Sequence, residues 1–316
     1  MADGTAAVAG LEPRMTTPRP KIGSLRLLSR RRSTSAFLLC VPLLLLVVCL
    51  KIYPTFYALY LSMLSRRLDT FVGFDNFSWL LARDAFHLVV FQSCLFAVTA
   101  VILKALLGFL LAHLMHNIRG KSQRIWRGLL LVPWVIPLAL STLTWWWMFD
   151  PSYSALNWTL KWMGFEPIPF LGTTWNARIA VIVVNTWYGA PFFMIMYLAA
   201  LKSVPESLYE AAAIDGASAW QKLAFITLPM MRNIIMITML YSLIVTFADF
   251  DIVRILTNGG PQDSTHLFST FAFTVGIQSG NIPRGAAVSL FMFPFLATVA
   301  FFVLRSVTRR SKEIEA

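Results

Sequence analysis

Long apolar runs without a Lys, Arg, Asp or Glu recur six times along the chain. They cover residues 33–50, 85–103, 128–149, 179–201, 233–248 and 285–304. A helix that crosses a bilayer needs about 20 mostly apolar residues, because its backbone must satisfy its own hydrogen bonds where water is absent. The pattern therefore predicts six spanning helices, at about residues 35–63, 86–115, 126–149, 178–201, 233–256 and 284–305.

The fifth predicted helix differs from the others in polarity. We expect it to continue through Asp249 and Asp251 to about residue 256, so that its second half is more polar than its first. A further apolar stretch, residues 267–277, is too short to span. It is expected to lie at the membrane interface or to cap a cavity.

Composition agrees with this pattern, since 57% of the 316 residues are hydrophobic and 13% are charged. The expected fold class is an all-α polytopic membrane protein. The net charge of +12 does not indicate nucleic-acid binding, because the basic residues gather in three segments: before the first run, between the second and third, and after the sixth. These residues are Arg14, Arg19, Lys21, Arg26, Arg30, Arg31, Arg32, Arg119, Lys121, Arg124, Arg127, Arg305, Arg309, Arg310 and Lys312.

Six spans place all three basic segments on one side of the membrane. Cytoplasmic flanks are enriched in Lys and Arg, so both termini are expected in the cytoplasm, with the basic clusters against anionic lipid. Residues 1–32 are expected to form a disordered cytoplasmic tail, and residues 311–316 are expected to form the cytoplasmic C-terminus. No small-residue cleavage site follows the first apolar run, which is therefore expected to remain as an anchor.

The cytoplasmic loop at residues 205–229 is itself patterned as helix. Pro205 and Glu206 suit a first helical turn, because proline needs no hydrogen-bond partner there and an acidic side chain favours the positive end of the helix dipole. Gly216 is expected to end this helix. A second helix should follow until Leu228-Pro229 closes it, so the loop predicts a short helical hairpin.

Within that loop the chain reads Glu210-Ala211-Ala212-Ala213-Ile214-Asp215-Gly216 and, after nine further residues, Ile226-Thr227-Leu228-Pro229. This pattern resembles the EAA loop of the permease subunits of binding-protein-dependent ABC importers, without a gap. Small side chains let a helix sit deep in the groove of another protein, and Gly216 permits the turn that ends it. The alternative, an amphipathic helix on lipid, is disfavoured because the stretch has few large apolar or basic residues.

The resemblance implies a type I ABC importer permease with a cytoplasmic coupling helix. It implies that an ATPase subunit contacts Glu206, Glu210, Ala211, Ala212, Asp215, Gly216, Leu228 and Pro229. It also implies the partners: two ATP-binding subunits, a second homologous permease and an extracytoplasmic sugar-binding protein. The chain has no phosphate-binding loop of the Gly-x-x-x-x-Gly-Lys-Ser/Thr type, so ATP and Mg are expected on the partner subunits and this chain is expected to hold no cofactor and to catalyse no reaction.

Four further segments resemble the maltose-type carbohydrate permeases, namely residues 131–137, 185–191, 204–209 and 256–261. The resemblance implies a sugar site midway through the membrane, on the third, fourth and fifth spans. Carried over position by position, it assigns Trp134, Leu138, Asn185, Tyr188, Gly189, Phe192, Ser242, Thr246 and Asp249 to substrate binding. Leu138, Thr246 and Asp249 are not the residue types of the maltose-type site, so the sugar need not be maltose and a partner subunit could supply the lining.

The residues themselves give a second argument for this site. Polar groups inside a bilayer are costly and mark binding sites, and Ser242, Thr246 and Asp249 follow at spacings that share one helix face. Two alternatives remain open: the aromatic residues pack between helices, and Asp249 forms a structural pair with Arg254.

Two lysines and two histidines in or beside the predicted spans are expected to have no role in binding or catalysis. Lys51 and Lys104 lie in otherwise uncharged helices and are expected to extend toward the interface or to face a partner helix. His113 and His116 have a metal-like spacing but lack a third ligand, so no metal site is predicted.

Competing function classes find less support. An importer of glycerol phosphate or of another small polar solute fits the same loop, although the absence of Lys and Arg from the predicted lining disfavours a highly anionic ligand. An ion-coupled secondary transporter would need intramembrane charge relays, and here strong carboxylates occur only near the end of the fifth span. No nucleophile and base or metal cluster indicates a membrane enzyme.

Overall fold

The computed structural model describes residues 36–118, 120–152 and 154–315, with side chains described as far as residue 308. The predicted tail at 1–32 lies outside these residues. The chain divides into two units, one ending at Phe56 and one beginning at Tyr57. The described residues of the first unit, 36–56, are helical throughout and include a wider π-helical turn, η1 (Val48–Ile52); α2 (Tyr53–Ser62) begins in this unit and ends in the second.

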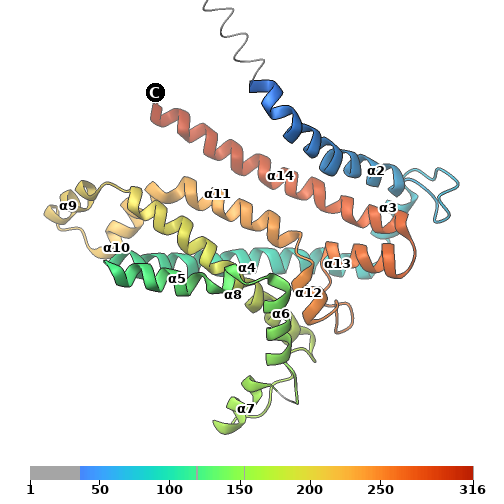
Figure 1. Ribbon diagram of the computed structural model, residues 1–316, viewed down its shortest axis with the longest axis horizontal. Helices are drawn as coiled ribbons and strands as arrows, with labels where there is room; N and C mark the ends of the chain where they lie inside the picture. Colours follow the sequence, from blue (N-terminus) through green and yellow to red (C-terminus); the bar gives the residue numbers. More distant parts are fainter. Residues whose placement is uncertain (1–35, 119, 153, 316) are drawn as a thin grey trace, which may run out of the picture. The chain divides into compact units, whose positions relative to one another are not determined.

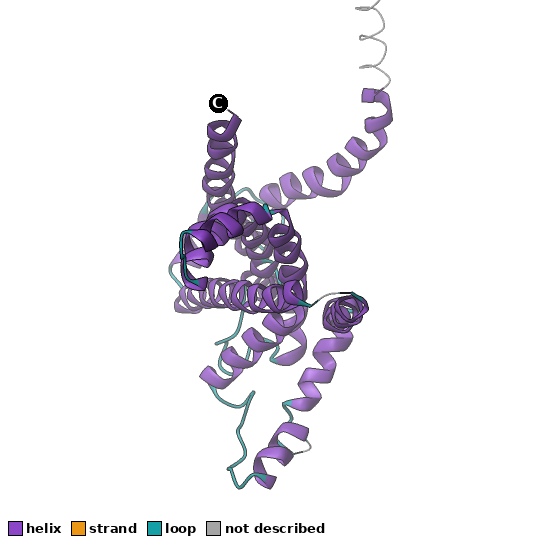
Figure 2. Ribbon diagram, turned by 90° about the vertical axis from the view of Figure 1, so that its left-hand side faces the viewer, coloured by secondary structure: helices purple, strands orange, loops and turns teal. Residues whose placement is uncertain are grey.

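The second unit is built from helices, and the described residues contain no strand beyond an isolated bridge between Leu64 and Phe71. Figure 2 shows helices joined by loops throughout. In chain order the helices after α2 are α3 (Asp75–Leu81), α4 (Asp84–Asn117), α5 (Lys121–Val135), α6 (Leu138–Met148), α7 (Ala155–Trp162), α8 (Thr174–Ser203), α9 (Glu206–Ile214), α10 (Ala219–Lys222), η2 (Leu223–Thr227), α11 (Leu228–Phe247), α12 (Asp251–Leu256), α13 (Phe268–Phe273), η3 (Thr274–Gln278) and α14 (Ile282–Glu315) (Figure 1).

Among the described residues, five continuous helices are long and apolar enough to cross a membrane, and a sixth span is present if one bent pair is counted as one. The five cover Ala36–Ser62, Asp84–Asn117, Thr174–Ser203, Ala219–Phe247 and Ile282–Thr308. The all-α polytopic fold predicted from the apolar runs is confirmed.

The third span is not the single helix predicted at 126–149. It consists of α5 and α6, which meet at an angle of 87°. The break lies at Ile136, whose backbone is extended with φ −67° and ψ 137°. Pro137 follows directly, and a proline ring disfavours the helical conformation in the residue before it.

The fifth span also differs from the prediction, at both ends. It stops at Phe247 instead of continuing through Asp249 to residue 256, and α12 is a separate short helix. The Asp249 carboxylate accepts a hydrogen bond from the Ile252 backbone N–H at 3.2 Å, which satisfies a donor at the start of α12. A short polar side chain that bonds to its own backbone in this way favours a break over a continuous helix.

At the other end, Leu228-Pro229 does not close the predicted hairpin. The helix that begins at Ala219 continues through η2 into α11 as one span. Pro229 occupies the first turn of α11, directly after the wider π-helical turn. A π-turn adds room in the helix backbone, which accommodates the proline ring and its missing N–H.

The core of the second unit lies where α4 packs along α8. The two helices lie close together at Gly108, where an added Cβ would lie 2.2 Å from Cβ of Phe193. Glycine therefore sets the distance between these two spans. The stretch predicted at 267–277 forms α13 and η3, which pack on α14, and the Phe268 side chain is buried.

Candidate functional site

A buried lysine joins three of the spans. Lys104 of α4 is 4% exposed, and its Nζ donates to Oδ1 of Asn185 at 2.8 Å and to Oγ1 of Thr246 at 2.6 Å. Asn185, on α8, in turn donates from Nδ2 to Oδ2 of Asp249 at 3.1 Å. The four side chains form one network, called here the Lys104 network, with an ammonium at one end and a carboxylate at the other.

The sequence around Asn185 explains why a lysine fits there. Gly189 lies one helical turn after Asn185, and an added Cβ on it would lie 2.4 Å from Cδ of Lys104. The missing side chain leaves a groove on α8 that holds the methylene groups of Lys104. A buried charge is tolerated only when it is paired and hydrogen-bonded, and the network supplies both.

The interpretation of Lys104 as a side chain that extends toward the interface is therefore wrong, whereas the alternative, that it faces a partner helix, agrees with its bonds to α8 and α11. Its ammonium ends inside the protein, because Asn185 and Thr246 from two other spans accept its hydrogen bonds and Asn185 links it to the Asp249 carboxylate. A signal was present in the sequence: a lysine inside one span and an aspartate at the end of another are costly unless they meet. Sequence spacing alone could not say that these two spans are neighbours.

The alternative pairing of Asp249 with Arg254 is not what the structure contains. Both carboxylate oxygens of Asp249 accept from other groups, Oδ2 from Asn185 and Oδ1 from the Ile252 N–H. Arg254 donates to Asn258, and its guanidinium lies 4.9 Å from the ring centroid of Phe273.

Aromatic rings form a second group on α8. The Phe192 ring centroid lies 5.9 Å from that of Trp134, on α5, and 5.3 Å from that of Tyr241, on α11. Trp134 and Tyr241 are 43% and 56% exposed, so this aromatic group has an open side. Tyr241 was missed in the sequence analysis, although it directly precedes Ser242, because its ring lies beside the polar face and not on it.

The structure therefore brings the predicted binding residues together in two sets. Asn185, Gly189, Thr246 and Asp249 surround Lys104, whereas Trp134 and Phe192 form the aromatic group with Tyr241. Tyr188 is half-buried, and it shares one face of α8 with Asn185, Gly189 and Phe192 because these positions follow at helical spacing.

The two remaining predicted residues lie elsewhere. Ser242 is 5% exposed inside the bundle. Leu138 begins α6 and packs against the core cluster that includes Phe96 and Ala180, so it belongs to the packing of α6.

The segment predicted to contact another protein is exposed. Helix α9 carries exposed Glu206, Glu210 and Ala211, while Ala212 is half-buried. It ends at Ile214, and Gly216 in the turn that follows has a φ of +76°, a conformation that favours glycine. There the Ala217 N–H donates to the Ala212 carbonyl at 2.8 Å, which satisfies a carbonyl at the helix end. Asp215 and Gly216 are exposed in this turn.

Large apolar side chains are exposed near this turn. Ile214, Trp220 and Phe225 are 88%, 74% and 78% exposed, and they lie at the end of α9, in α10 and in η2. Leu228 and Pro229 follow, also exposed, at the start of α11. Exposed apolar side chains of this kind are typical of a surface that another protein or lipid covers, and they correct the expectation that this loop has few large apolar residues. Figure 1 shows α9 and α10 at one end of the bundle.

One hydrogen bond ties α9 to the spanning helix. The Tyr209 hydroxyl and Oγ1 of Thr227 lie 2.8 Å apart, and Thr227 belongs to the π-helical turn η2. A cavity of about 940 Å³ lies beside this contact and is lined, among others, by His113, His116 and Glu206. In the described residues no three potential metal-ligating side chains of His, Cys, Asp or Glu come together.

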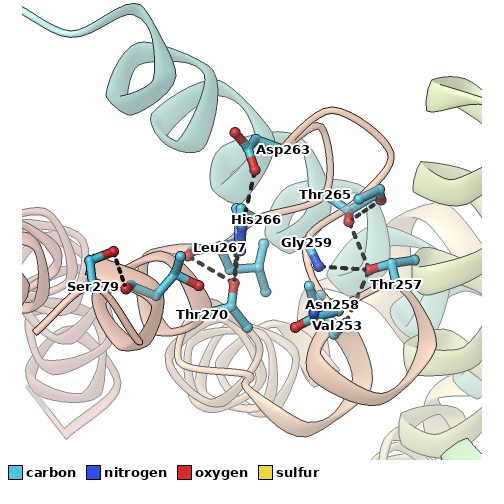
Figure 3. A network of polar contacts seen from close by, with 12 residues as sticks. Val253, Thr257, Asn258, Gly259, Asp263, Thr265, His266, Leu267, Thr270 and Ser279 are labelled. Carbon is cyan, nitrogen blue, oxygen red and sulfur yellow. Dashed lines mark hydrogen bonds and ion pairs between the residues drawn. The ribbon is translucent and has the colours of Figure 1, made fainter. Parts of the chain in front are cut away.

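A second polar network lies in the loop between α12 and α13 (Figure 3). Oγ1 of Thr265 contacts Oγ1 of Thr257 at 2.8 Å and donates to the Gly260 carbonyl at 2.7 Å. His266 is 4% exposed; its Nδ1 lies 3.1 Å from Oγ1 of Thr270. Burial lowers the pKa of His266 below its ordinary value, against the opposing effect of Asp263.

The chain is similar to known subunits of transport systems. The family model described as "Binding-protein-dependent transport system inner membrane component" matches residues 104–312. The chain is 32% identical over 283 residues to the trehalose/maltose transport system permease protein MalF of Thermococcus litoralis, covering 88% of this chain and 95% of that protein. It is 26% identical to the diacetylchitobiose uptake system permease protein DasB of Streptomyces coelicolor, covering 91% of each.

A solved structure shares the fold. A chain of a bacterial ABC transporter involved in the import of the acidic polysaccharide alginate superposes with a TM-score of 0.77 at 23% identity. The alignment covers 90% of this chain and 99% of that chain.

Proposed function

Because this chain belongs to the family of inner membrane components of binding-protein-dependent transport systems and is a multi-pass permease subunit of an ABC importer, we propose that the transported solute is a sugar. The proposal covers a mono- or disaccharide or a related polyol. The observation that carries it is the similarity to a trehalose/maltose permease over nearly the whole of both chains.

The site supports the same proposal. A sugar offers hydroxyl groups on its edges and an apolar ring face, and it needs polar partners beside an aromatic surface. The Lys104 network provides amide, hydroxyl and carboxylate groups, and the open aromatic group of Trp134, Phe192 and Tyr241 shares helices α8 and α11 with it. Substrate binding by Asn185, Tyr188, Gly189, Phe192, Thr246 and Asp249 is part of the proposal.

Coupling to ATP is proposed to occur through α9 and the turn that follows. ATP and Mg would bind to two partner subunits, which close on ATP and push on Glu206, Glu210 and their exposed neighbours. Since Tyr209 is bonded to Thr227, motion of α9 would reach α11 and the Lys104 network at its far end. We propose that this opens the cavity outward and that hydrolysis resets it.

The assembly and orientation are also proposals. A second homologous permease would complete the pathway, and an extracytoplasmic binding protein would deliver the sugar. Both chain termini are placed in the cytoplasm because the basic segments gather on one side.

The experiment is sugar uptake into proteoliposomes that contain the whole complex with its binding protein and internal ATP. The panel contains maltose, trehalose, a monosaccharide, a polyol and glycerol 3-phosphate. ATP-dependent uptake of a sugar supports the proposal, and uptake of glycerol phosphate alone would replace it. Uptake abolished by a protonophore but independent of ATP would point to an ion-coupled transporter.

A variant pair tests the coupling segment in the same vesicles. Glu210→Ala is expected to uncouple sugar-stimulated ATP hydrolysis from uptake, whereas the matched control Glu166→Ala, exposed in another loop, should behave as wild type. Equal behaviour of the two variants would remove α9 from the mechanism.

A further inference from the structure

We infer that Lys104 is a specificity-determining residue of the proposed sugar site: paired through Asn185 with Asp249, it keeps the polar lining electrically neutral, so that uncharged saccharides are accepted and acidic ones are refused. This inference rests on the proposed function.

The first step is the position of the ammonium. Lys104 lies well inside α4, and its Nζ contacts the side-chain oxygens of Asn185 and Thr246, two residues proposed to bind the sugar. An ammonium carries three donors and no acceptor. Two are used within the described residues, which leaves one N–H that a sugar oxygen can accept.

The second step is the orientation that the lysine imposes. Because Oδ1 of Asn185 accepts from Lys104, the amide must turn its Nδ2 toward Asp249, as observed at 3.1 Å. The Asp249 carboxylate, which can only accept, holds the amide in the same orientation from the other side. The lysine and the aspartate together fix which of the site's groups act as donors and which as acceptors.

The third step is charge. The ammonium and the carboxylate sit at the two ends of the Asn185 amide, and their charges cancel. Asp251, the next carboxylate, is exposed and its field is weakened by solvent. An uncharged sugar leaves this balance intact, whereas a uronic acid would bring an unpaired negative charge next to Asp249 in a poorly hydrated site.

The fourth step is that helix α8 leaves space for the Lys104 side chain. Gly189 has no side chain at the point where a Cβ would lie 2.4 Å from Cδ of Lys104. The groove in α8, the two hydrogen bonds and the carboxylate come from three separate segments. A lysine that only snorkelled toward the interface would require none of them.

The experiment measures equilibrium binding to the complete transporter complex in nanodiscs, without the binding protein, so that selectivity of the permease alone is read. The probes are labelled trehalose or maltose and a disaccharide of the same size that carries one uronate. The permeases are wild type, Lys104→Met, Asp249→Asn and the double variant. Lys51→Met, which removes an exposed lysine from the first span, is the matched control.

The readout is the ratio of uronate affinity to neutral-sugar affinity. Asp249→Asn leaves an unbalanced ammonium and should raise this ratio about tenfold or more, the size expected when one close charge repulsion is removed at a poorly hydrated site. Lys104→Met should lower the ratio, and the double variant should return it near the wild-type value. The Lys51→Met ratio should equal that of wild type.

Failure takes two distinguishable forms. If wild type binds neither probe, the proposed function falls and this inference with it. If wild type binds the neutral sugar and the ratio stays constant in the single variants, only the inference falls and Lys104 is a packing residue. Should Lys104→Met fail to assemble, Asp249→Asn decides alone, because a gain of uronate binding does not arise from loss of structure.

Discussion

The Lys104 network and the α9 surface, defined as exposed Ile214, Trp220, Phe225, Leu228 and Pro229 at and after the end of α9, place their side chains in opposite environments. In the network, polar side chains are buried, and their partners lie 81, 142 and 64 residues away in the sequence. Around α9, apolar side chains are exposed, while the polar ends of the short helices are satisfied by near neighbours, as in the capping box of Ser218 and Gln221. The hydrogen bonds of the network form within one chain, whereas the apolar side chains around α9 find no cover within it.

This difference teaches how each region responds to change. A substitution in the network should alter the stability of the chain itself, because charged groups lose their only partners. A substitution on the α9 surface should leave the chain stable and alter assembly, because an exposed side chain makes few contacts within the chain. Four predictions test this contrast, in order of falling effect.

Gly189→Ala should produce the largest change. The new methyl group would displace the Lys104 stem and weaken its two hydrogen bonds, which should lower the free energy of unfolding by about 1–3 kcal/mol. The matched control is Gly128→Ala in α5, where an added Cβ meets nothing within 4 Å and helix propensity favours alanine. Unfolding in mixed detergent micelles should therefore shift in opposite directions for the two variants; equal shifts would mean that Gly189 does not make room for the lysine.

Ile214→Ser should break assembly without affecting the chain. The side chain is 88% exposed, so the free energy of unfolding should change by less than about 0.5 kcal/mol. Affinity for the ATPase subunit should fall about tenfold if the side chain is buried in the docked complex. Phe71→Ser, at a 69% exposed apolar position far from α9 in sequence, is the control and should leave that affinity unchanged. A loss of stability in place of a loss of affinity would contradict the comparison.

Tyr209→Phe tests the point where the two regions connect. It removes only the hydroxyl that contacts Thr227, a change worth about 0.5–1.5 kcal/mol. We expect more ATP hydrolysed per sugar transported, because α9 is less firmly tied to α11. Thr227→Val should have a similar effect, and adding Tyr209→Phe to it should change little further; full additivity in this double-variant cycle would show that the contact carries no coupling.

The smallest effect is expected from pH, through His266. Burial lowers the pKa of this side chain in the folded protein, so the unfolded loop takes up a proton first as pH falls. The stabilising contribution is therefore fully present above the ordinary pKa of about 6.5 and is lost as pH falls from there through the folded value. Hydrogen exchange of the backbone at residues 257–270 should speed up between pH 7.5 and pH 5.5, after correction for intrinsic rates, and His266→Gln should remove that dependence.

Several features of the chain were already determined by the order of its residues. The apolar runs placed the spans, because a backbone in lipid must satisfy its own hydrogen bonds and a long apolar run does so as helix, and the Glu210–Gly216 motif marked the exposed helix that ends just before Gly216. Asn185, Thr246 and Asp249 were singled out because polar side chains in an apolar stretch are costly wherever they lie. These are local properties, which depend on neighbouring residues and can therefore be predicted from the sequence.

The tertiary structure alone decided which of those costly groups meet. The break at Ile136, the π-turn before Pro229 and the end of α11 at Phe247 each set the direction in which a span presents its side chains. Lys104 received an ordinary interpretation because its two partners and the groove at Gly189 come from other helices. A residue's own neighbours fix whether it forms helix, but the energy of a buried charge depends on groups that only the folded chain brings within hydrogen-bonding distance.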